Sequence, residues 1–392
     1  MLALRMLTGG ESHGPAVIAV IDDVPAHVPL TQEYVDRDLA RRQTGHGRGE
    51  RMRIENDCAR ILSGVRYGMT MGSPVTLLVE NRDHEKWTDV MSVEPSTGEG
   101  DKPLTRPRPG HGDMAGMLKY GTGDARDILE RASARETAAR VAAGAVARRL
   151  LEELGITVRG RVIAVGEAVA GSFENTLESD FILADSDTMR CSDSEVSKRM
   201  MARIDSASEA GDSVGGAFEV AAFGVPPGLG SHAQADRRLD ARLCAALVSI
   251  PGIKGAEVGA GFRLAAARGS KAHDEIFLDE SRGLYRETNQ AGGIEAGMSN
   301  GENIVLRAVM KPIPTLGTPT ATVDVATRAP AEAFKERADV CAVPAASVVG
   351  EAVVAFALAD AAQQKFGDDS LPEMKRNMEG YLEQISRLWR RR

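Results

Sequence analysis

Hydrophobic residues occur along the chain in short blocks that are separated by glycine, proline and charged residues. Four compact blocks predict strands at residues 17–21, 74–80, 218–225 and 304–310. Three longer segments predict helices at residues 31–42, 236–249 and 344–366. Strands and helices therefore occur in both halves of the chain, which indicates a mixed α/β protein.

The clearest helix is predicted over residues 132–154, where alanine, valine and leucine dominate. Ser133 and Glu136 form an S-x-x-E capping box at its start, and Gly155 follows its end. The nearly continuous surface of small apolar side chains predicts a central, tightly packed helix. Because its first turn directly follows Arg131, the start of this helix is also a candidate anion site.

The polar segments are predicted to lie at the surface. Residues 93–112 are predicted to form a loop, and residues 170–210 to alternate exposed helix with loop. Residues 263–289 are predicted to form a long surface loop, a kind of segment that often acts as a lid. Residues 372–392 predict a peripheral, basic amphipathic helix.

No Pro/Ser-rich linker divides the chain, so we expect residues 1–392 to form one α/β (α+β) domain with two similar halves. A division into two domains near residue 160 is the alternative. No run of about 18 apolar residues and no secretory signal is apparent, so no membrane span is expected. The four cysteines are far apart and form no CxxC pair, which favours free thiols in a reducing cytoplasm.

The formal net charge is −8, yet four separate segments combine arginine or lysine with histidine, serine, glycine or proline, and a fifth, residues 10–14, places serine and histidine between glycines. A basic surface does not explain them. Arginine offers a planar pair of donors to carboxylate or phosphate, and glycine lets the backbone approach a ligand closely. They therefore predict a pocket for a polyanionic small molecule, built from residues 10–14, 41–53, 106–113, 131–136 and 311–315.

Two histidines are candidates for chemistry. His13 lies between Ser12 and Gly14, and His111 follows Arg108 in a Pro-Gly-His-Gly-Asp segment. A lone histidine is usually structural, but two in similar glycine-flanked settings favour proton transfer or charge stabilisation. We treat the remaining histidines as ordinary and expect no metal site, since no metal-ligand spacing occurs; they are His27, His46, His84, His232 and His273.

The arginines after residue 41 lie in a glycine-rich loop, which predicts a backbone that wraps a ligand; a solvated charged loop is the alternative. The phosphate-binding motif GxxxxGK[ST] is absent. Asp339 precedes the apolar helix at residues 344–366. We expect Arg337 to favour its ionised form, so that it acts as a base, whereas the simpler interpretation is a charge at a helix end.

These segments together resemble the chorismate synthase family over nearly the full length of the chain. The resemblance is carried by ten segments in matching order and spacing. They are GESHG (10–14), RRQTGHGR (41–48), ILSGVRYGMTMGSPV (61–75), RPGHGD (108–113), RASARET (131–137), DSVGG (212–216), SIPGIKGAEVGAGF (249–262), GMSNGENI (297–304), KPIPT (311–315) and RADVCAVP (337–344).

The resemblance implies a β-α-β sandwich with a central helical layer, and a lyase of the shikimate pathway. Such an enzyme converts 5-enolpyruvylshikimate 3-phosphate to chorismate by 1,4-elimination of phosphate and the C6 hydrogen. The resemblance further implies reduced FMN as cofactor, NADPH or an external flavin reductase as the source of electrons, and a homotetramer.

The resemblance also implies roles for individual residues. His13 would assist the departing phosphate, His111 would stabilise reduced flavin, and Asp339 with Ser12 and Ser133 would manage the proton at flavin N5. Substrate would be held by Arg42, Arg48, Arg51, Arg108, Arg135 and Arg337. Cofactor contacts, including NADP contacts at the first two, would fall on Arg42, Arg48, Arg131, Ala132, Ser133, Pro251, Gly252, Ala296, Lys311, Pro312, Ile313, Pro314, Thr315 and Arg337.

The chain departs from the family pattern at a few positions. Asp23 and Ala296 stand where the family often has glycine, Ala338 replaces a serine or histidine, and Pro251-Gly252 replaces a polar residue and alanine. None of these changes removes an expected catalytic side chain.

Segments rich in arginine and glycine are compatible with two other functions. Non-enzymatic RNA binding is disfavoured by the acidic chain, its 4% aromatic content and the isolation of its basic segments. Another flavin-dependent enzyme that acts on a phosphorylated polyanion is the better alternative.

Overall fold

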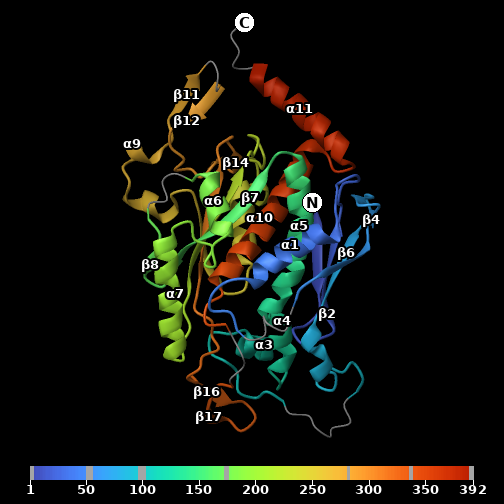
Figure 1. Ribbon diagram of the computed structural model, residues 1–392, viewed down its shortest axis with the longest axis vertical. Helices are drawn as coiled ribbons and strands as arrows, with labels where there is room; N and C mark the ends of the chain where they lie inside the picture. Colours follow the sequence, from blue (N-terminus) through green and yellow to red (C-terminus); the bar gives the residue numbers. More distant parts are fainter. Residues whose placement is uncertain are drawn as a thin grey trace.

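The computed structural model describes residues 4–49, 56–95, 103–171, 176–279, 283–334 and 339–387. Two antiparallel sheets enclose a layer of helices, which is the β-α-β sandwich that the family resemblance implied (Figure 1). The strands predicted at 17–21, 74–80, 218–225 and 304–310 all form, with ends shifted by no more than a few residues.

The first sheet has the strand order β1-β2-β6-β3. Side chains alternate between its faces, so that Val17, Ala19 and Ile21 are fully buried against the helices while Ile18 and Val20 point away. The strands are β1 (Arg5–Gly9), β2 (Ala16–Asp22), β3 (Ala59–Ser63) and β6 (Val75–Glu80).

The second sheet has the order β10-β15-β9-β7-β8. Its central strands β9 and β15 are buried on both faces, which explains their continuous apolar sequences. The strands are β7 (Thr157–Val165), β8 (Ala168–Val169), β9 (Gly216–Phe223), β10 (Ile253–Val258) and β15 (Ile304–Met310).

The helical layer is centred on α5 (Thr137–Glu153) and α10 (Val343–Phe366). Their small side chains permit close packing, because a Cβ placed on Gly144 would lie 2.4 Å from the Cβ of Ala352. By length and hydropathy α10 qualifies as a membrane span, but 89% of its apolar window is buried inside the protein. Two further helices, α1 (Gln32–Gln43) and α8 (Leu239–Val248), pack on α10.

The remaining elements lie around this core (Figure 1). The helices are α3 (Asp113–Tyr120), α4 (Arg126–Ala132), α6 (Glu178–Asp185), α7 (Ser194–Glu209), α9 (Gly269–Ala272) and α11 (Leu371–Arg387), with 3-10 turns η1 (Arg82–Lys86), η2 (Ala134–Glu136), η3 (Ala235–Arg237) and η4 (Gly261–Ala266). Short strand pairs are β4 (Val65–Arg66) with β5 (Met69–Thr70), β11 (Ile276–Asp279) with β12 (Gly283–Arg286), β13 (Ile294–Glu295) with β14 (Met298–Ser299), and β16 (Ala321–Asp324) with β17 (Ala329–Glu332).

Two sequence predictions are wrong in detail. The helix predicted from residue 132 begins at Thr137, because Ser133 is extended (ψ 146°) and its hydroxyl accepts from the Arg135 N–H of a 3-10 turn, not from α5. The loop predicted at residues 263–289 contains the short helix α9 and the β11–β12 hairpin. Its described residues do not line the cavity described below, so they give no support for a lid.

Candidate active site

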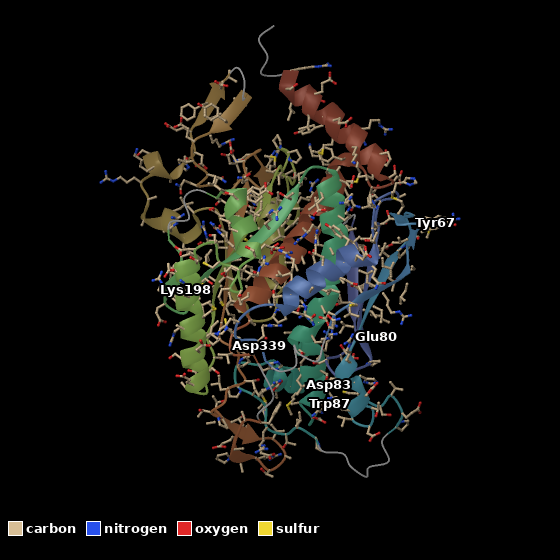
Figure 2. All side chains as sticks on the ribbon, in the orientation of Figure 1. Tyr67, Glu80, Asp83, Trp87, Lys198 and Asp339 are labelled. Carbon is tan, nitrogen blue, oxygen red and sulfur yellow. The ribbon has the colours of Figure 1, made fainter. Side chains whose placement is uncertain are left out.

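A cavity of about 700 Å³ opens at the end of the sandwich where α5 and α10 begin. Figure 2 shows Asp83, Trp87 and Asp339 gathered toward this lower end of the molecule. Unsatisfied backbone N–H groups and the helix dipole favour anions at helix starts. Residues of the η2–α5 junction and of the first turns of α10 line the cavity. The backbone at these helix starts therefore gives the cavity wall a positive electrostatic potential, to which the side chains add.

His13 is fixed by a buried carboxylate. Its Nδ1 lies 2.9 Å from Glu130 Oε1, and its backbone N–H donates to Glu130 Oε2 at 2.9 Å. Its ring stacks on Trp87 with centroids 4.0 Å apart. Burial alone would raise the pKa of Glu130, but the hydrogen bonds and charge of His13, with Arg126, hold it below its ordinary value.

His111 has a similar partner. Its Nδ1 makes a very short contact with Oδ1 of the fully buried Asp113. Arg108 donates to Asp113 from Nε at 2.9 Å and to Thr315 Oγ1 at 3.3 Å. Burial alone would raise the pKa of Asp113, but the contacts with His111 and Arg108 hold it well below its usual range.

Arg42 and Arg135 share one buried carboxylate, that of Asp57, with contacts of 2.5 Å each. Both arginines are buried, and Arg42 Nε has no hydrogen-bond partner among the described residues. Burial lowers the pKa of Arg42 although Asp57 opposes this shift. Two guanidinium groups beside one carboxylate leave a net positive charge, which suits an anionic ligand.

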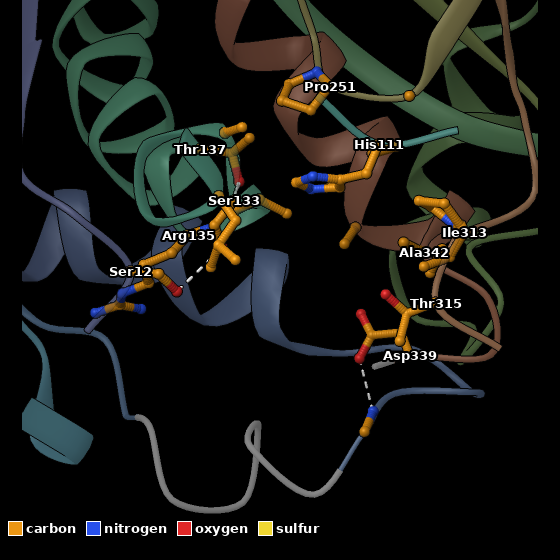
Figure 3. A pocket seen from close by; sticks show the side chains of 18 of the residues that line it. Ser12, His111, Ser133, Arg135, Thr137, Pro251, Ile313, Thr315, Asp339 and Ala342 are labelled. Atoms are coloured by element: carbon orange, nitrogen blue, oxygen red, sulfur yellow. Dashed lines mark hydrogen bonds between the residues drawn. The ribbon is translucent and has the colours of Figure 1, made fainter. Parts of the chain in front are cut away.

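Asp339 lies on the other side of the cavity from the serines. Arg48 Nη1 donates to its Oδ2 at 2.5 Å, and the Gly49 N–H donates to its Oδ1 at 2.7 Å. Ser133 donates to Ser12 Oγ at 3.1 Å. Figure 3 shows the two serines paired at one side and Asp339 separated from them across the view. The neighbour expected for Asp339, Arg337, lies outside the described residues, as does Arg51.

An apolar wall faces these polar groups. It is lined by Leu129, Ala132, Ile250, Pro251, Gly252, Met310, Pro312, Ile313, Pro314, Ala345, Ala346 and Val349. Lys311 and Thr315 interrupt it, and Lys311 Nζ donates to the Gly110 carbonyl. Besides Ser12, His13 and Arg42, the structure brings fourteen further predicted site residues to this cavity. They are Arg48, Arg108, His111, Ala132, Ser133, Arg135, Pro251, Gly252, Lys311, Pro312, Ile313, Pro314, Thr315 and Asp339.

Two predicted cofactor residues do not line this cavity. Arg131 instead donates to the carbonyl oxygens of Gly10 and Thr8 at 3.0 and 3.1 Å, which ties α4 to β1. Ala296 occupies the turn between β13 and β14. Among the described residues no group of three or more His, Cys, Asp or Glu side chains is arranged to hold a metal ion.

Comparison with known proteins identifies the family. A family model described as chorismate synthase matches residues 4–363. The chain belongs to the chorismate synthase family. Chorismate synthase of Desulforudis audaxviator is 56% identical over 382 residues, covering 97% of this chain and 98% of its own. That of Pelobacter propionicus is 54% identical over 392 residues, covering 98% and 100%. A crystal structure of chorismate synthase superposes with a TM-score of 0.80 at 40% identity, covering 98% of this chain and 99% of the other.

Two departures from the chorismate synthase pattern have a conformational consequence. Asp23 (φ 60°) and Ala296 (φ 49°) both adopt the left-handed backbone conformation that favours glycine. The backbone therefore keeps the geometry of a glycine position even where this chain carries a side chain.

Sequence reasoning missed the carboxylates behind the ligand-facing side chains. Asp113 was contained in the quoted RPGHGD segment without a role, and Glu130 directly precedes Arg131. The spacing of Arg126 and Glu130, which form an i, i+4 ion pair at 3.0 Å, was the available signal for Glu130. Asp57 and Trp87 carried no signal, because their partners are distant in sequence. His84, which the sequence predicts to be an ordinary histidine, donates from Nδ1 to the His13 carbonyl at 2.8 Å.

Proposed function

We propose that this protein converts 5-enolpyruvylshikimate 3-phosphate to chorismate and phosphate by 1,4-elimination, with reduced FMN as cofactor. The observation that carries the proposal is the convergence of four arginines and two histidines on one cavity in a chain of this family: Arg42, Arg48, Arg108, Arg135, His13 and His111. A cavity of about 700 Å³ is within the range of about 300–1,000 Å³ that small-molecule sites occupy.

The substrate carries two carboxylates and a phosphate, which is roughly three to four negative charges at neutral pH. Desolvating these charges requires several cations with hydrogen-bond geometry. The Arg42–Asp57–Arg135 cluster would bind one anionic group. The buried Arg42 Nε has no hydrogen-bond acceptor among the described residues, so it could donate to this group. Arg48 and Arg108 would bind others, together with Arg51 and Arg337 outside the described residues.

The described residues fit FMN as a second occupant. The apolar wall around Pro251 and Ile313 suits a flat ring system, and Lys311 with the arginines suits its phosphate. Ala132, Gly252 and the segment 312–315 complete the proposed contacts inside the cavity. The contacts expected from Arg131 and Ala296, which do not line the cavity, stay a prediction. When bound, reduced FMN would supply the electron-rich ring that accepts the C6 hydrogen at N5.

We propose for the protein groups the roles that the family resemblance implies, and their positions are compatible with these roles. His13 would present Nε2 to the departing phosphate and donate a proton to it. His111 would lie beside the reduced cofactor and stabilise its charge. Ser12 and Ser133 would pass a proton along their hydrogen bond, and Asp339 would act as the base that removes it. The separation of Asp339 from the serines requires a bound ligand or water to connect them.

Several wider expectations belong to the same proposal. NADPH, with contacts at Arg42 and Arg48, or an external flavin reductase would supply electrons. The enzyme would act in the cytoplasm, in agreement with four cysteines that form no disulfide. It would assemble as a homotetramer.

The decisive experiment mixes purified protein anaerobically with the substrate and dithionite-reduced FMN and measures released phosphate and chorismate. Stoichiometric release of both, only with reduced flavin, is the expected result. Flavin reduction or oxidation without phosphate release would favour the alternative of another flavin-dependent enzyme. Aerobic NADPH with FMN then tests whether the protein reduces its own flavin.

A further inference from the structure

Glu130 contacts His13 more completely than packing requires. The carboxylate accepts from the His13 backbone N–H at 2.9 Å and meets the imidazole Nδ1 with both oxygens, at 2.9 and 3.0 Å. One side chain therefore holds both the backbone and the ring of the same residue. Glu130 itself is only 4% exposed, so water offers its carboxylate little competing hydrogen bonding.

Two segments fix Glu130 and His13: helix α4, and the η1 turn with the Trp87 that follows it. Arg126, one turn earlier on α4, donates to Glu130 Oε1 at 3.0 Å. Trp87 stacks on the His13 ring at 4.0 Å, and the Arg126 guanidinium lies 5.2 Å above the Trp87 ring. From the η1 turn, His84 donates to the His13 carbonyl at 2.8 Å. His13 is therefore restrained at the face of its ring, at Nδ1, and at its backbone N–H and carbonyl groups.

The chemical consequence concerns the other ring nitrogen. A carboxylate can only accept, so the neutral His13 ring must carry its proton on Nδ1 to satisfy Glu130. Nε2 is then the nitrogen left for the cavity that His13 lines. When the ring takes a second proton, that proton is on Nε2, the nitrogen that can deliver it to a ligand in the cavity.

We propose that Glu130 is a positioning residue for proton delivery: it fixes the tautomer and orientation of His13 so that Nε2–H is directed at an anionic leaving group. A carboxylate behind a catalytic histidine has this function in hydrolytic triads. This inference rests on the proposed function only for the identity of the leaving group. The contact itself and the tautomer it imposes do not depend on the reaction.

Two substitutions separate the charge of Glu130 from its hydrogen bond. Glu130→Gln retains an oxygen that accepts from Nδ1–H but loses the negative charge. Glu130→Ala loses both. We expect kcat for phosphate release to fall by about 10-fold to 100-fold in Glu130→Gln and further in Glu130→Ala, with KM changed less than kcat, because the loss falls on proton transfer.

A double-mutant cycle distinguishes positioning from general structure. His13→Ala removes the group through which Glu130 acts, so Glu130→Gln in that background should reduce kcat by less than about twofold. If the two losses multiply instead, Glu130 does not act through His13 and the proposal is overturned. Glu219→Gln removes another fully buried carboxylate, paired with Arg161 and Arg307 in the second sheet, and should leave kcat of the folded protein unchanged.

A measurement without substrate keeps the inference separate from the proposed function. In ¹⁵N NMR of the neutral ring, assigned by comparison with His13→Ala, we expect the proton on Nδ1 in the wild type and in Glu130→Gln. We expect it on Nε2 in Glu130→Ala. A wild-type ring protonated on Nε2 would overturn the positioning role even if phosphate is released. Absence of phosphate release from the wild type would instead reject the proposed function and leave the tautomer result standing.

Discussion

Asp339 presents its carboxylate to the cavity while accepting hydrogen bonds from Arg48 and the Gly49 N–H. Asp339→Asn keeps the shape and removes the base, so we expect turnover to fall by about 100-fold or more with substrate binding retained. Anaerobic phosphate release, with flavin spectra to follow the bound complex, measures both quantities.

Asp205→Asn is the matched control for that substitution. Asp205 lies outside the cavity, its side chain is 61% exposed, and it contacts His46 at 2.5 Å. It should turn over like the wild type. Turnover of Asp339→Asn within a few-fold of wild type would reduce Asp339 to an anchor for Arg48.

Ala296 stores a small conformational strain. A φ of 49° costs a residue that carries a Cβ about 1–2 kcal/mol. Glycine avoids this cost, but its greater freedom in the unfolded chain lowers the free energy of unfolding by about 0.4–1 kcal/mol. Ala296→Gly should therefore raise the free energy of unfolding by up to about 1 kcal/mol, measured by denaturant titration. Ala267→Gly, at a φ of −83°, should lower it slightly. Equal destabilisation by both changes would show that the turn at Ala296 is unstrained.

Among the secondary-structure elements, the helices are joined by one buried carboxylate. Glu351 on α10 is fully buried and accepts from Arg41 of α1 at 2.8 Å, Arg148 of α5 at 2.5 Å and Arg190 at 2.5 Å. The Gly160 N–H of β7 also donates to it at 2.8 Å. Three helices (α1, α5 and α10), one loop and one strand are thus held at a single point inside the sandwich.

Glu351→Gln leaves the buried guanidinium groups of Arg148 and Arg190, and the half-buried one of Arg41, with one negative charge fewer to compensate them. We expect the free energy of unfolding to fall by about 3–5 kcal/mol, measured by chemical denaturation. Glu80→Gln breaks an exposed ion pair with Arg60, of length 3.1 Å, and should cost less than about 1 kcal/mol. A loss at Glu351 as small as that at Glu80 would contradict the role assigned to the cluster.

The same cluster determines one part of the pH dependence of stability. Burial alone would raise the pKa of Glu351, but Arg41, Arg148 and Arg190 hold it well below its usual range. A carboxyl with a depressed pKa in the folded state stabilises the protein above the unfolded pKa of about 4.3 and loses that contribution as pH falls. The difference between wild type and Glu351→Gln should therefore stay constant from about pH 8 to 5 and shrink below about pH 4. A difference that shrinks already between pH 7 and 5 would contradict this assignment.

At the scale of the whole molecule, the outer face of the first sheet is apolar. Leu7 and Leu62 are 69% and 49% exposed, and Ile18, Val20 and Leu78 lie between them on the same face. Opposite charges border it, with Arg5 beside Asp22 at one end and the Arg60–Glu80 ion pair at the other. A second copy of the chain, turned by a two-fold axis, would cover the apolar centre and match these charges.

This face is where we expect one contact of the proposed homotetramer. Leu7→Lys should convert the assembly to a smaller species at micromolar protein concentration, measured by light scattering after size exclusion. Tyr67→Lys, at an 89% exposed site on the β4–β5 hairpin, is the control and should leave the mass unchanged. A tetramer that survives Leu7→Lys would assign the contact to another surface.

The sequence by itself determined four of the strands (β2, β6, β9 and β15), the central helices and most of the segments that form the cavity. Alternation in β2 and β6 and the alanine-rich run of α5 are local patterns, because burial of one face repeats at a fixed spacing. Glycine beside arginine or histidine also predicted the ligand-facing loops. This signal is local too, because the glycine that lets the backbone approach a ligand and the side chain that binds the ligand are neighbours in sequence.

Only the tertiary structure decided which charges neutralise one another. Glu130 and His13 are 117 positions apart, Asp57 and Arg135 are 78 apart, and Arg48 and Asp339 are 291 apart. No local spacing encodes such pairs. The tertiary structure also determined that α5 begins at Thr137. Ser133 caps the 3-10 turn η2 before it and hydrogen-bonds Ser12, which is 121 positions away in the sequence. Partner choice in a buried site depends on the packing of distant elements, and that packing is a property of the whole fold.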